Sequence, residues 1–312
     1  MLFVVLGPTA SGKERLALAL AGRLGAEIIS VDSMKVYRGL DIGTAKPGAE
    51  ERSRIPHHGL DVADPAERFT AARFMQVAEE AIADVRSRGR PVVLSGGTAL
   101  YHMALLAGLF EGPGRDDGLR RRLEDEAARE GPAALWRRLE REDPGAAARI
   151  HPNDARRLVR ALEVLELTGR PISGLQRQWD APWQAPRHPF RMARLRWQRQ
   201  ALLGRIAARV DRMRGAGLLE EAKGVWERRA RLSETPLQAV AYKEFFPFFE
   251  GREEEDAAWE RLRRHTARLA KAQETWFKRF PAQPVDCVGP GDPALEAEDA
   301  VLRIWEGKEV ES

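Results

Sequence analysis

The sequence predicts an α/β fold in which a parallel sheet is flanked by helices and is interrupted by an inserted all-helical section. The first observation is that short apolar runs alternate with helical patterns over residues 1–112. The second is that residues 117–168 are helical and highly charged in pattern and contain no strand candidate. A strand pattern returns at residues 193–197. Strands that alternate with helices pair in parallel and bind ligands at their carboxyl ends.

The individual elements follow from hydrophobic periodicity and helix caps. We expect Thr70 to cap a helix, and either Asn153 or Asp154 to cap another. Strands are expected at residues 2–6, 27–31, 92–94 and 193–197. The chain then divides into a sheet domain, residues 1–112 and 190–312, and an inserted helical domain, residues 113–189.

The composition is that of a globular protein with a sizeable core. Of the 312 residues, 43% are hydrophobic and 31% are charged. The net charge of +4 permits a nucleic-acid partner but does not require one. A single cysteine, Cys287, excludes a disulfide within the chain and a cysteine zinc site. With neither a signal-like region nor an apolar run of membrane length, we expect a cytoplasmic protein with no membrane partner.

A glycine-rich loop lies between the first apolar run and a helical pattern. Its G-x-x-x-x-G-K spacing binds phosphate through backbone N–H groups and the positive end of the helix. This predicts a domain similar to the P-loop NTPases, which bind ATP or other nucleotides. The expected phosphate-binding residues are Gly7, Pro8, Thr9, Ala10, Ser11, Gly12, Lys13 and Glu14. Glu14 departs from the motif, which has Ser or Thr there to hold Mg²⁺.

Two further side chains end predicted strands at the same edge of the sheet. Asp32 is a candidate metal ligand or general base, and its alternative role is to cap a turn. Thr98 can hydrogen-bond a ligand, or it can cap the next helix. Ser95 stands where a phosphate-loop ATPase normally has an acid, which argues against ordinary ATP hydrolysis.

Residues 191–214 contain eight arginines and only one acidic residue. Arg205, Arg209 and Arg212 recur at helical spacing and share a face, which is a pattern that binds phosphate, although charged runs often only solvate a helix. The adjacent His57 and His58 have no partner at metal-ligand spacing, so we expect a structural or hydrogen-bonding role.

Several segments together resemble the tRNA dimethylallyltransferases, also called tRNA isopentenyltransferases. In family order these are GPTASGK (7–13), VDSMKVYRGLDIGTAKP (31–47), GGTALY (96–101), ARIHPNDARRLVRALEVLELTGRP (148–171), AYKE (241–244) and RLAKAQETWFKR (268–279). The resemblance covers roughly residues 3–280.

The resemblance implies transfer of a dimethylallyl group from dimethylallyl diphosphate to N6 of adenosine 37 in tRNA, with release of diphosphate. Lys13 and Arg205 would bind the diphosphate, Asp32 would accept the N6 proton, and Thr98 would hydrogen-bond the reacting region. These four are the expected catalytic residues. Mg²⁺ is the implied cofactor, with Glu14 as its doubtful ligand.

The implied partner is the anticodon stem-loop of tRNA, bound by a monomer, because the target base lies in a loop from which it can be flipped. The implied tRNA-binding residues are Asp32, Ser33, Met34, Lys35, Thr98, Arg120, Arg156, Arg157, Leu158, Val159, Arg160, Gln238 and Lys243.

Four residues depart from the family pattern. Glu14 replaces Thr or Ser, and Lys35 stands where Gln is common. Ala241 replaces Gly, and Ala272 stands where Arg is common. Two other functions therefore stay open at this point: an enzyme acting on a small molecule or a free adenine nucleotide, and a non-catalytic RNA-binding protein with a degenerate phosphate loop.

Overall fold

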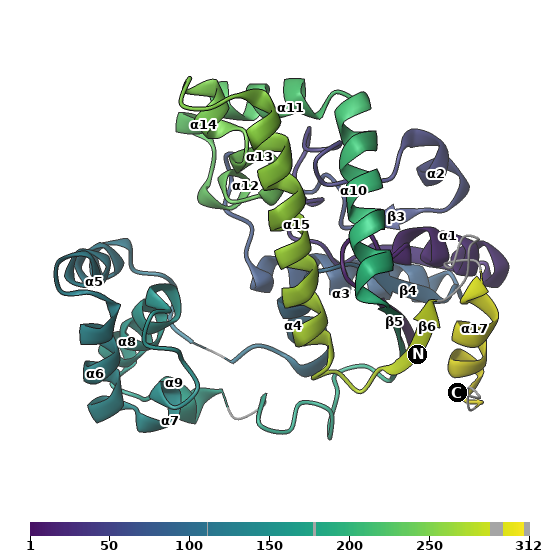
Figure 1. The fold of residues 1–312 in the computed structure, drawn as a ribbon. Coiled ribbons are helices and arrows are strands. Elements are labelled where there is room, and N and C mark those ends of the chain that lie inside the picture. The colour runs from purple at the N-terminus through teal and green to yellow at the C-terminus, as the bar shows by residue number, and fades with distance from the viewer. Residues whose placement is uncertain (111, 177–178, 288–295, 309–312) are drawn as a thin grey trace. The chain divides into compact units, whose positions relative to one another are not determined.

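The computed structural model of the chain describes residues 1–110, 112–176, 179–287 and 296–308. These residues form two compact units. The first comprises Met1–Leu106 and Arg187–Ser312, and the second comprises Ala107–Pro186. Figure 1 shows both units as a ribbon.

The sheet unit contains a six-stranded sheet in the order β3-β2-β4-β1-β5-β6, and every pair of neighbouring strands is parallel. The strands are β1 (Leu2–Leu6), β2 (Glu27–Ser30), β3 (His57–His58), β4 (Val92–Ser95), β5 (Phe190–Trp197) and β6 (Gln283–Cys287). The predicted α/β fold and its four predicted strands are confirmed. The two edge strands were not predicted, because β3 has only two residues and β6 contains Pro284 and exposes three of its five residues.

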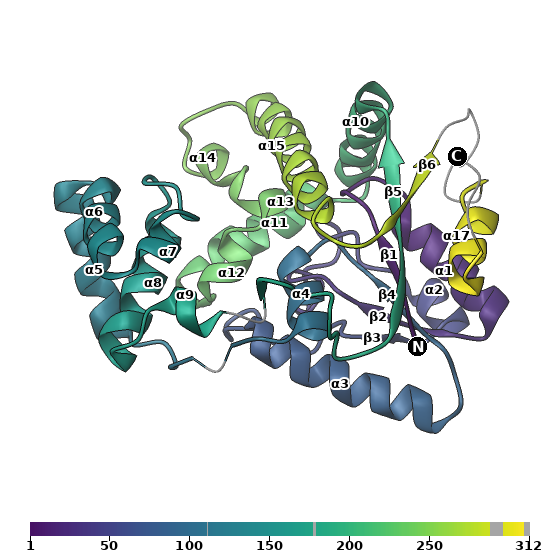
Figure 2. The same cartoon turned by 90° about the horizontal axis from the view of Figure 1, so that it is seen from below.

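Helices cover both faces of the sheet. On one face α1 (Lys13–Leu24) and α17 (Glu298–Glu306) share a buried core with β1, β4 and β5. Figure 2 shows α3 (Ala71–Ser87) and α4 (Ala99–Ala107) on the opposite side of the strands. Thr70 caps α3 as predicted, since its side chain accepts a hydrogen bond from the N–H of Arg73.

Two long helices stand at the carboxyl end of the sheet. They are α10 (Arg199–Gly215) and α15 (Glu255–Phe277), which pack side by side (Figure 1). Shorter elements complete the unit: α2 (Ala49–Arg54), α11 (Leu218–Glu227), the 3₁₀ turn η2 (Arg229–Arg231), α12 (Glu234–Leu237), α13 (Val240–Lys243) and α14 (Phe246–Phe249).

The second unit is all-helical over its described residues. It contains α5 (Asp117–Glu130), α6 (Pro132–Glu142), α7 (Pro144–Ala147), α8 (Ala155–Thr168) and α9 (Ile172–Leu175). Of the two residues expected as caps for α8, Asp154 takes the position, because its side chain accepts the N–H of Arg157. Leucine and alanine side chains from these helices form a separate core.

The units meet at 106/107 and 186/187, whereas the predicted boundaries were 112/113 and 189/190. Phe110 packs against the helical core, and the indole of Trp179 donates to the carbonyl of Gly108, so the segment after Leu106 belongs with the helices. At the return, Arg187 and His188 both contact Glu79 of α3, which ties them to the sheet unit.

Candidate active site

The phosphate loop connects β1 to α1 through a tight turn that demands small residues. Gly12 immediately precedes α1 with a φ of 85°, in the left-handed region that favours glycine. A Cβ on Gly7 would lie 2.5 Å from the hydroxyl oxygen of Ser11. The loop therefore has the backbone shape that its spacing predicts, and it opens onto the positive end of a helix.

Lys13 is the first residue of α1 and is 6% exposed. Its Nζ lies 3.4 Å from the carbonyl of Pro8 and 3.9 Å from Oε1 of Glu14. Burial lowers the pKa of Lys13, and the charge of Glu14 opposes that shift. A buried ammonium with two weak contacts is placed to bind an anion in the loop.

Asp32 lies at the carboxyl end of β2 and holds a turn with one oxygen. Its Oδ1 accepts the N–H groups of Met34 at 2.8 Å and Lys35 at 3.3 Å. Both roles considered for Asp32 are thus compatible, because Oδ2 has no hydrogen bond from the described residues. That oxygen is available to accept a proton.

Thr98 contacts the same turn from the neighbouring strand. Its Oγ1 accepts the N–H of Ser33 at 3.0 Å and lies 3.3 Å from the Ser33 hydroxyl. The two turns approach closely because Gly96 has no side chain. A Cβ on Gly96 would lie 2.0 Å from the carbonyl oxygen of Val31. The structure therefore brings Asp32, Ser33 and Thr98 together, as the topology of a parallel sheet predicts.

A cavity of about 380 Å³ lies beside the loop and is strongly basic. Its cationic side chains are Lys13, Arg15, Lys35, Lys46, Arg205, Arg209 and Arg212. The shared face predicted for the three α10 arginines is confirmed. The guanidinium of Arg205 donates to the carbonyl of Ala10 at 2.8 Å and lies 4.5 Å from the Trp197 ring centre, which fixes it at the loop.

Other arginines of the 191–214 stretch bind carboxylates or carbonyls of the protein instead of facing the cavity. Arg196 pairs with Asp286, and Arg191 donates to the carbonyl of Trp305. Arg214 pairs with Glu255 at the start of α15. The sequence count overstated the phosphate-facing charge, because these acids and carbonyls come from distant parts of the chain.

A second cavity of about 110 Å³ adjoins Asp32. Asp32 and Thr9 line this cavity together with apolar side chains from α10, α13 and α15. The apolar side chains are those of Val210, Met213, Val240, Leu262 and Leu269. Lys13, Glu14, Lys35 and Arg209 line both cavities and form their shared boundary. A basic chamber thus adjoins a smaller one of mixed lining, in which these apolar side chains lie beside the predicted base.

Gln273 joins the two glycine turns and was missed as a site residue. Its Oε1 accepts the N–H of Thr9 at 2.7 Å, and its Nε2 donates to the carbonyl of Gly97 at 3.0 Å. The only sequence signal was its place in the late RLAKAQETWFKR motif. Its contacts connect positions 264 and 176 residues away, which no local pattern reveals.

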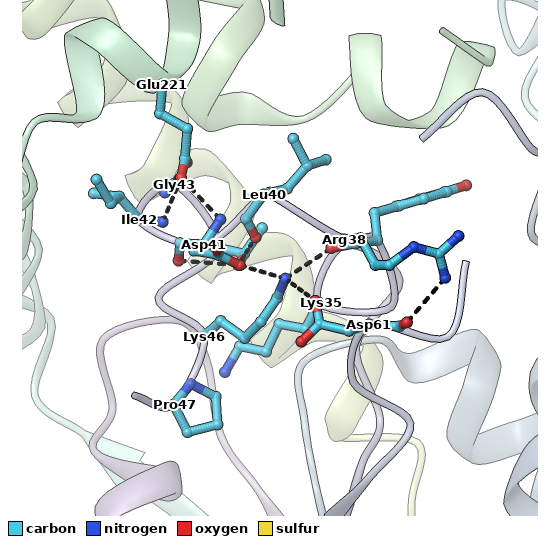
Figure 3. A network of polar contacts seen from close by, with 12 residues as sticks. Lys35, Arg38, Leu40, Asp41, Ile42, Gly43, Lys46, Pro47, Asp61 and Glu221 are labelled. Atoms are coloured by element: carbon cyan, nitrogen blue, oxygen red, sulfur yellow. Dashed lines mark hydrogen bonds and ion pairs between the residues drawn. The ribbon is translucent and has the colours of Figure 1, made fainter. Parts of the chain in front are cut away.

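A polar network shapes the long loop after Asp32 (Figure 3). The carboxylate of Glu221, from α11, accepts the backbone N–H groups of Asp41, Ile42 and Gly43, each at 2.9 Å. It also accepts the hydroxyl of Tyr242 at 2.8 Å. This side chain binds the loop to two helices, although nothing in the sequence pattern singled out Glu221.

Lys46 holds the other half of the network. Its side chain is 1% exposed, and its Nζ donates to the carbonyl of Tyr37 at 2.7 Å. The same Nζ donates to the carboxylates of Asp41 and Asp61 (Figure 3). Burial raises the pKa of Asp61, but bonds from Lys46 and Arg52 outweigh it and lower the pKa overall. These contacts hold the loop in a defined conformation.

His57 and His58 are hydrogen-bonded, as predicted. Nδ1 of His57 lies 2.7 Å from the carbonyl of Ile55, and Nε2 of His58 lies 2.7 Å from the buried carboxylate of Glu27. Across residues 1–110, 112–176, 179–287 and 296–308, no group of three or more His, Cys, Asp or Glu side chains is arranged to hold a metal ion.

Among the expected tRNA-binding residues of the helical unit, exposure differs sharply. Arg156 and Arg157 are exposed on α8. Leu158 and Val159 are buried in the helical core, so their side chains are enclosed by protein. Both belong to the apolar face of α8, which packs against the other helices of the unit.

Arg120 and Arg160 converge on Glu163, whose side chain is fully buried. Arg120 donates two bonds of 2.8 Å, and Arg160 donates one of 2.7 Å. Burial raises the pKa of Glu163, but the two arginines lower it to about 2. Both arginines are partly exposed, at 20% and 30%, and their main contact is within the unit.

Gln238 directly follows α12 and is exposed, and Lys243 is the last residue of α13 and is half-buried. Neighbouring Tyr242 is fully buried, and Ala241 packs against Gly43, since a Cβ on Gly43 would lie 2.7 Å from that of Ala241.

No helix among the described residues is long and apolar enough to cross a bilayer.

The comparisons with known proteins agree with one another. The family model of the IPP transferases matches residues 35–280. The tRNA dimethylallyltransferase of Geobacter metallireducens is 48% identical over 281 residues, which cover 89% of each chain. That of Methylococcus capsulatus is 49% identical over 278 residues, or 88% of each chain.

Solved structures show the same similarity. The tRNA isopentenylpyrophosphate transferase of Bacillus halodurans superposes with a TM-score of 0.69 at 38% identity and covers 98% of this chain and 97% of that one. A eukaryotic dimethylallyltransferase acting on tRNA gives a TM-score of 0.76 at 25% identity and covers all of this chain and 81% of that one. The chain therefore belongs to the tRNA dimethylallyltransferase family of enzymes, also known as the IPP transferases.

Proposed function

We propose that this enzyme transfers the dimethylallyl group of dimethylallyl diphosphate to N6 of adenosine 37 in tRNA and forms N6-dimethylallyladenosine and diphosphate. The observation that carries the proposal is the pair of adjoining cavities. One is basic and lies at the phosphate loop, and in the other Asp32 lies beside apolar side chains of α10, α13 and α15. An allylic diphosphate has this division into an anionic end and an apolar end.

The chemistry follows from the placement of the charges. As the allylic C–O bond breaks, its electron pair goes to the diphosphate, while the N6 lone pair forms the new C–N bond. Lys13 and the α10 arginines stabilise the negative charge that develops on the leaving group. Oδ2 of Asp32 accepts the N6 proton. Contributions of this kind are each worth about 10²–10⁴-fold in rate.

Residues that position the reactants would also limit the access of water. Apolar side chains of α10 and α15 line part of the chamber beside Asp32, where the allylic carbon would lie. The hydrogen bonds of Thr98 and Gln273 hold the Asp32 turn and the phosphate loop in register. Ser95, whose buried hydroxyl has no partner among the described residues, lines the basic cavity and can donate to a phosphate oxygen.

The second substrate is assigned to tRNA on the basis of the exposed arginines of α8 and the ordered loop 32–47. We propose that Ser33, Met34, Gln238 and Lys243 contact the anticodon loop and that Arg156 and Arg157 contact its phosphates. Lys35, which the resemblance also implied there, is 3% exposed and bonded to Glu14. A monomer acting in the cytoplasm completes this proposal. Mg²⁺ stays a prediction from the resemblance, and ATP binding stays a prediction from the loop motif alone.

Mass spectrometry of tRNA nucleosides tests the proposal. Incubation with tRNA and dimethylallyl diphosphate is expected to yield N6-dimethylallyladenosine, and Asp32→Asn is expected to slow single turnovers by about 10²-fold or more. Prenylation of free AMP with none on tRNA would identify a small-molecule enzyme instead. Tight tRNA binding without diphosphate release would favour the non-catalytic alternative.

A further inference from the structure

The two departures nearest the reaction site contact each other. Nζ of Lys35 bonds to Oε2 of Glu14 across 21 positions of sequence. Glu14 lies in the first turn of α1, and Lys35 follows the turn that Asp32 holds. The residue that lacks the motif's hydroxyl is therefore matched by an ammonium from a different loop.

The pair is held in a defined position. The Lys35 side chain is only 4% exposed, and its backbone N–H is bonded to Oδ1 of Asp32. Burial raises the pKa of Glu14, but the charges of Lys35 and Lys13 outweigh burial and lower it to about 2. Glu14 is thus ionised throughout the neutral range and keeps the buried ammonium in place.

The side chains around residue 14 do not fit a metal ion. A threonine or serine there would present a neutral hydroxyl, whereas the Glu14 carboxylate faces two ammonium groups, from Lys35 and Lys13. Both groups repel a divalent cation. A metal ligated by Glu14, whose side chain is 37% exposed, would have to displace Lys35 and leave that ammonium buried without its partner, which is costly.

We propose that Lys35, held by Glu14, is the protein's own cation for the diphosphate and replaces a metal ion at residue 14. The proposal rests on the proposed function, because it takes the ligand to be the donor's diphosphate. Relative to an uncharged pair, Glu14 and Lys35 add one negative and one positive charge, so the net charge of the site is unchanged.

What the pair changes is where the charge lies. Lys35 lines both cavities together with Lys13 and Arg209. Its ammonium therefore faces the boundary at which the anionic and apolar ends of the donor meet. There it can stabilise the leaving diphosphate as the C–O bond breaks.

The experiment measures binding of inorganic diphosphate to the full chain by calorimetry, in EDTA and in Mg²⁺, for the wild type, Lys35→Gln, Glu14→Thr and the double variant. The wild type is expected to bind in EDTA, with Mg²⁺ changing its Kd by less than about threefold. Lys35→Gln is expected to bind about 30-fold more weakly in EDTA, because Glu14 is left unpaired beside the anion. Mg²⁺ should recover most of that loss.

The double variant separates the pair from its parts. With no charge at either position it folds without a buried unpaired group, and it should bind diphosphate well only in Mg²⁺. The inference is overturned if the wild type requires Mg²⁺ for binding or if Lys35→Gln binds as tightly as the wild type in EDTA. A wild type that binds no diphosphate under either condition would overturn the proposed function as well, which distinguishes the two failures.

Discussion

Replacing Glu221 by Gln is expected to release the loop 41–47 from α11 and α13. The carboxylate accepts three backbone N–H groups at 2.9 Å and one hydroxyl at 2.8 Å (Figure 3). A hydrogen bond to a charged acceptor contributes about 1.5–3 kcal/mol, and a neutral one contributes about 1 kcal/mol. Gln keeps one oxygen and turns an NH₂ group toward the donors of Asp41 and Ile42.

The expected cost follows from that count. Two bonds are lost, with water replacing them at these partly exposed N–H groups, and two bonds become neutral. We expect a loss of about 2–4 kcal/mol, most of it at the N–H groups of Asp41 and Ile42, which lose their acceptor. Burial raises the pKa of Tyr242, and the charge of Glu221 raises it further, so the phenol stays protonated as a donor at every working pH.

Amide hydrogen exchange by mass spectrometry measures the effect locally. Peptides that cover residues 41–47 should exchange about 30- to 1,000-fold faster in Glu221→Gln, since 1.4 kcal/mol corresponds to a factor of ten. The matched control is Glu220→Gln, which makes the same change one position earlier in α11. Equal exchange of this loop in the two variants would refute the anchoring role of Glu221.

Three further outcomes follow from the structure. Gly96→Ala should lower the unfolding free energy by about 3 kcal/mol in urea titrations, because its Cβ meets Val31, whereas Gly204→Ala, with open space in α10, should raise it by up to about 1 kcal/mol. The stability that Glu163 contributes should be complete above its ordinary pKa of 4.5 and should disappear as pH falls toward 2. The difference in unfolding free energy between wild type and Glu163→Gln should therefore narrow over that range. A difference that is independent of pH would contradict the ion pair. Arg205→Lys should weaken diphosphate binding about tenfold by calorimetry, since Lys cannot both stack on the indole and reach the loop carbonyl, and an unchanged Kd would contradict that geometry.

Much of the site was predictable because its parts are local. The loop spacing identifies Lys13, and the ends of buried strands identify Asp32 and Thr98, since parallel strands bring their carboxyl ends to one edge. Helical spacing alone predicted that Arg205, Arg209 and Arg212 share a face. The family resemblance implied that Leu158 and Val159 bind tRNA, whereas the structure encloses both side chains in the core of the helical unit.

The sequence by itself determined the fold class, the phosphate loop and the edge of the sheet at which the proposed chemistry takes place, because each depends on short-range periodicity and on glycine positions. Only the tertiary structure decided how the charges are paired. Glu14 with Lys35, Glu221 with the loop 41–43, and Gln273 with both glycine turns connect residues far apart in the chain. Which acid meets which base depends on packing between distant segments, and for that reason two departures from the family pattern form one ion pair at the phosphate loop.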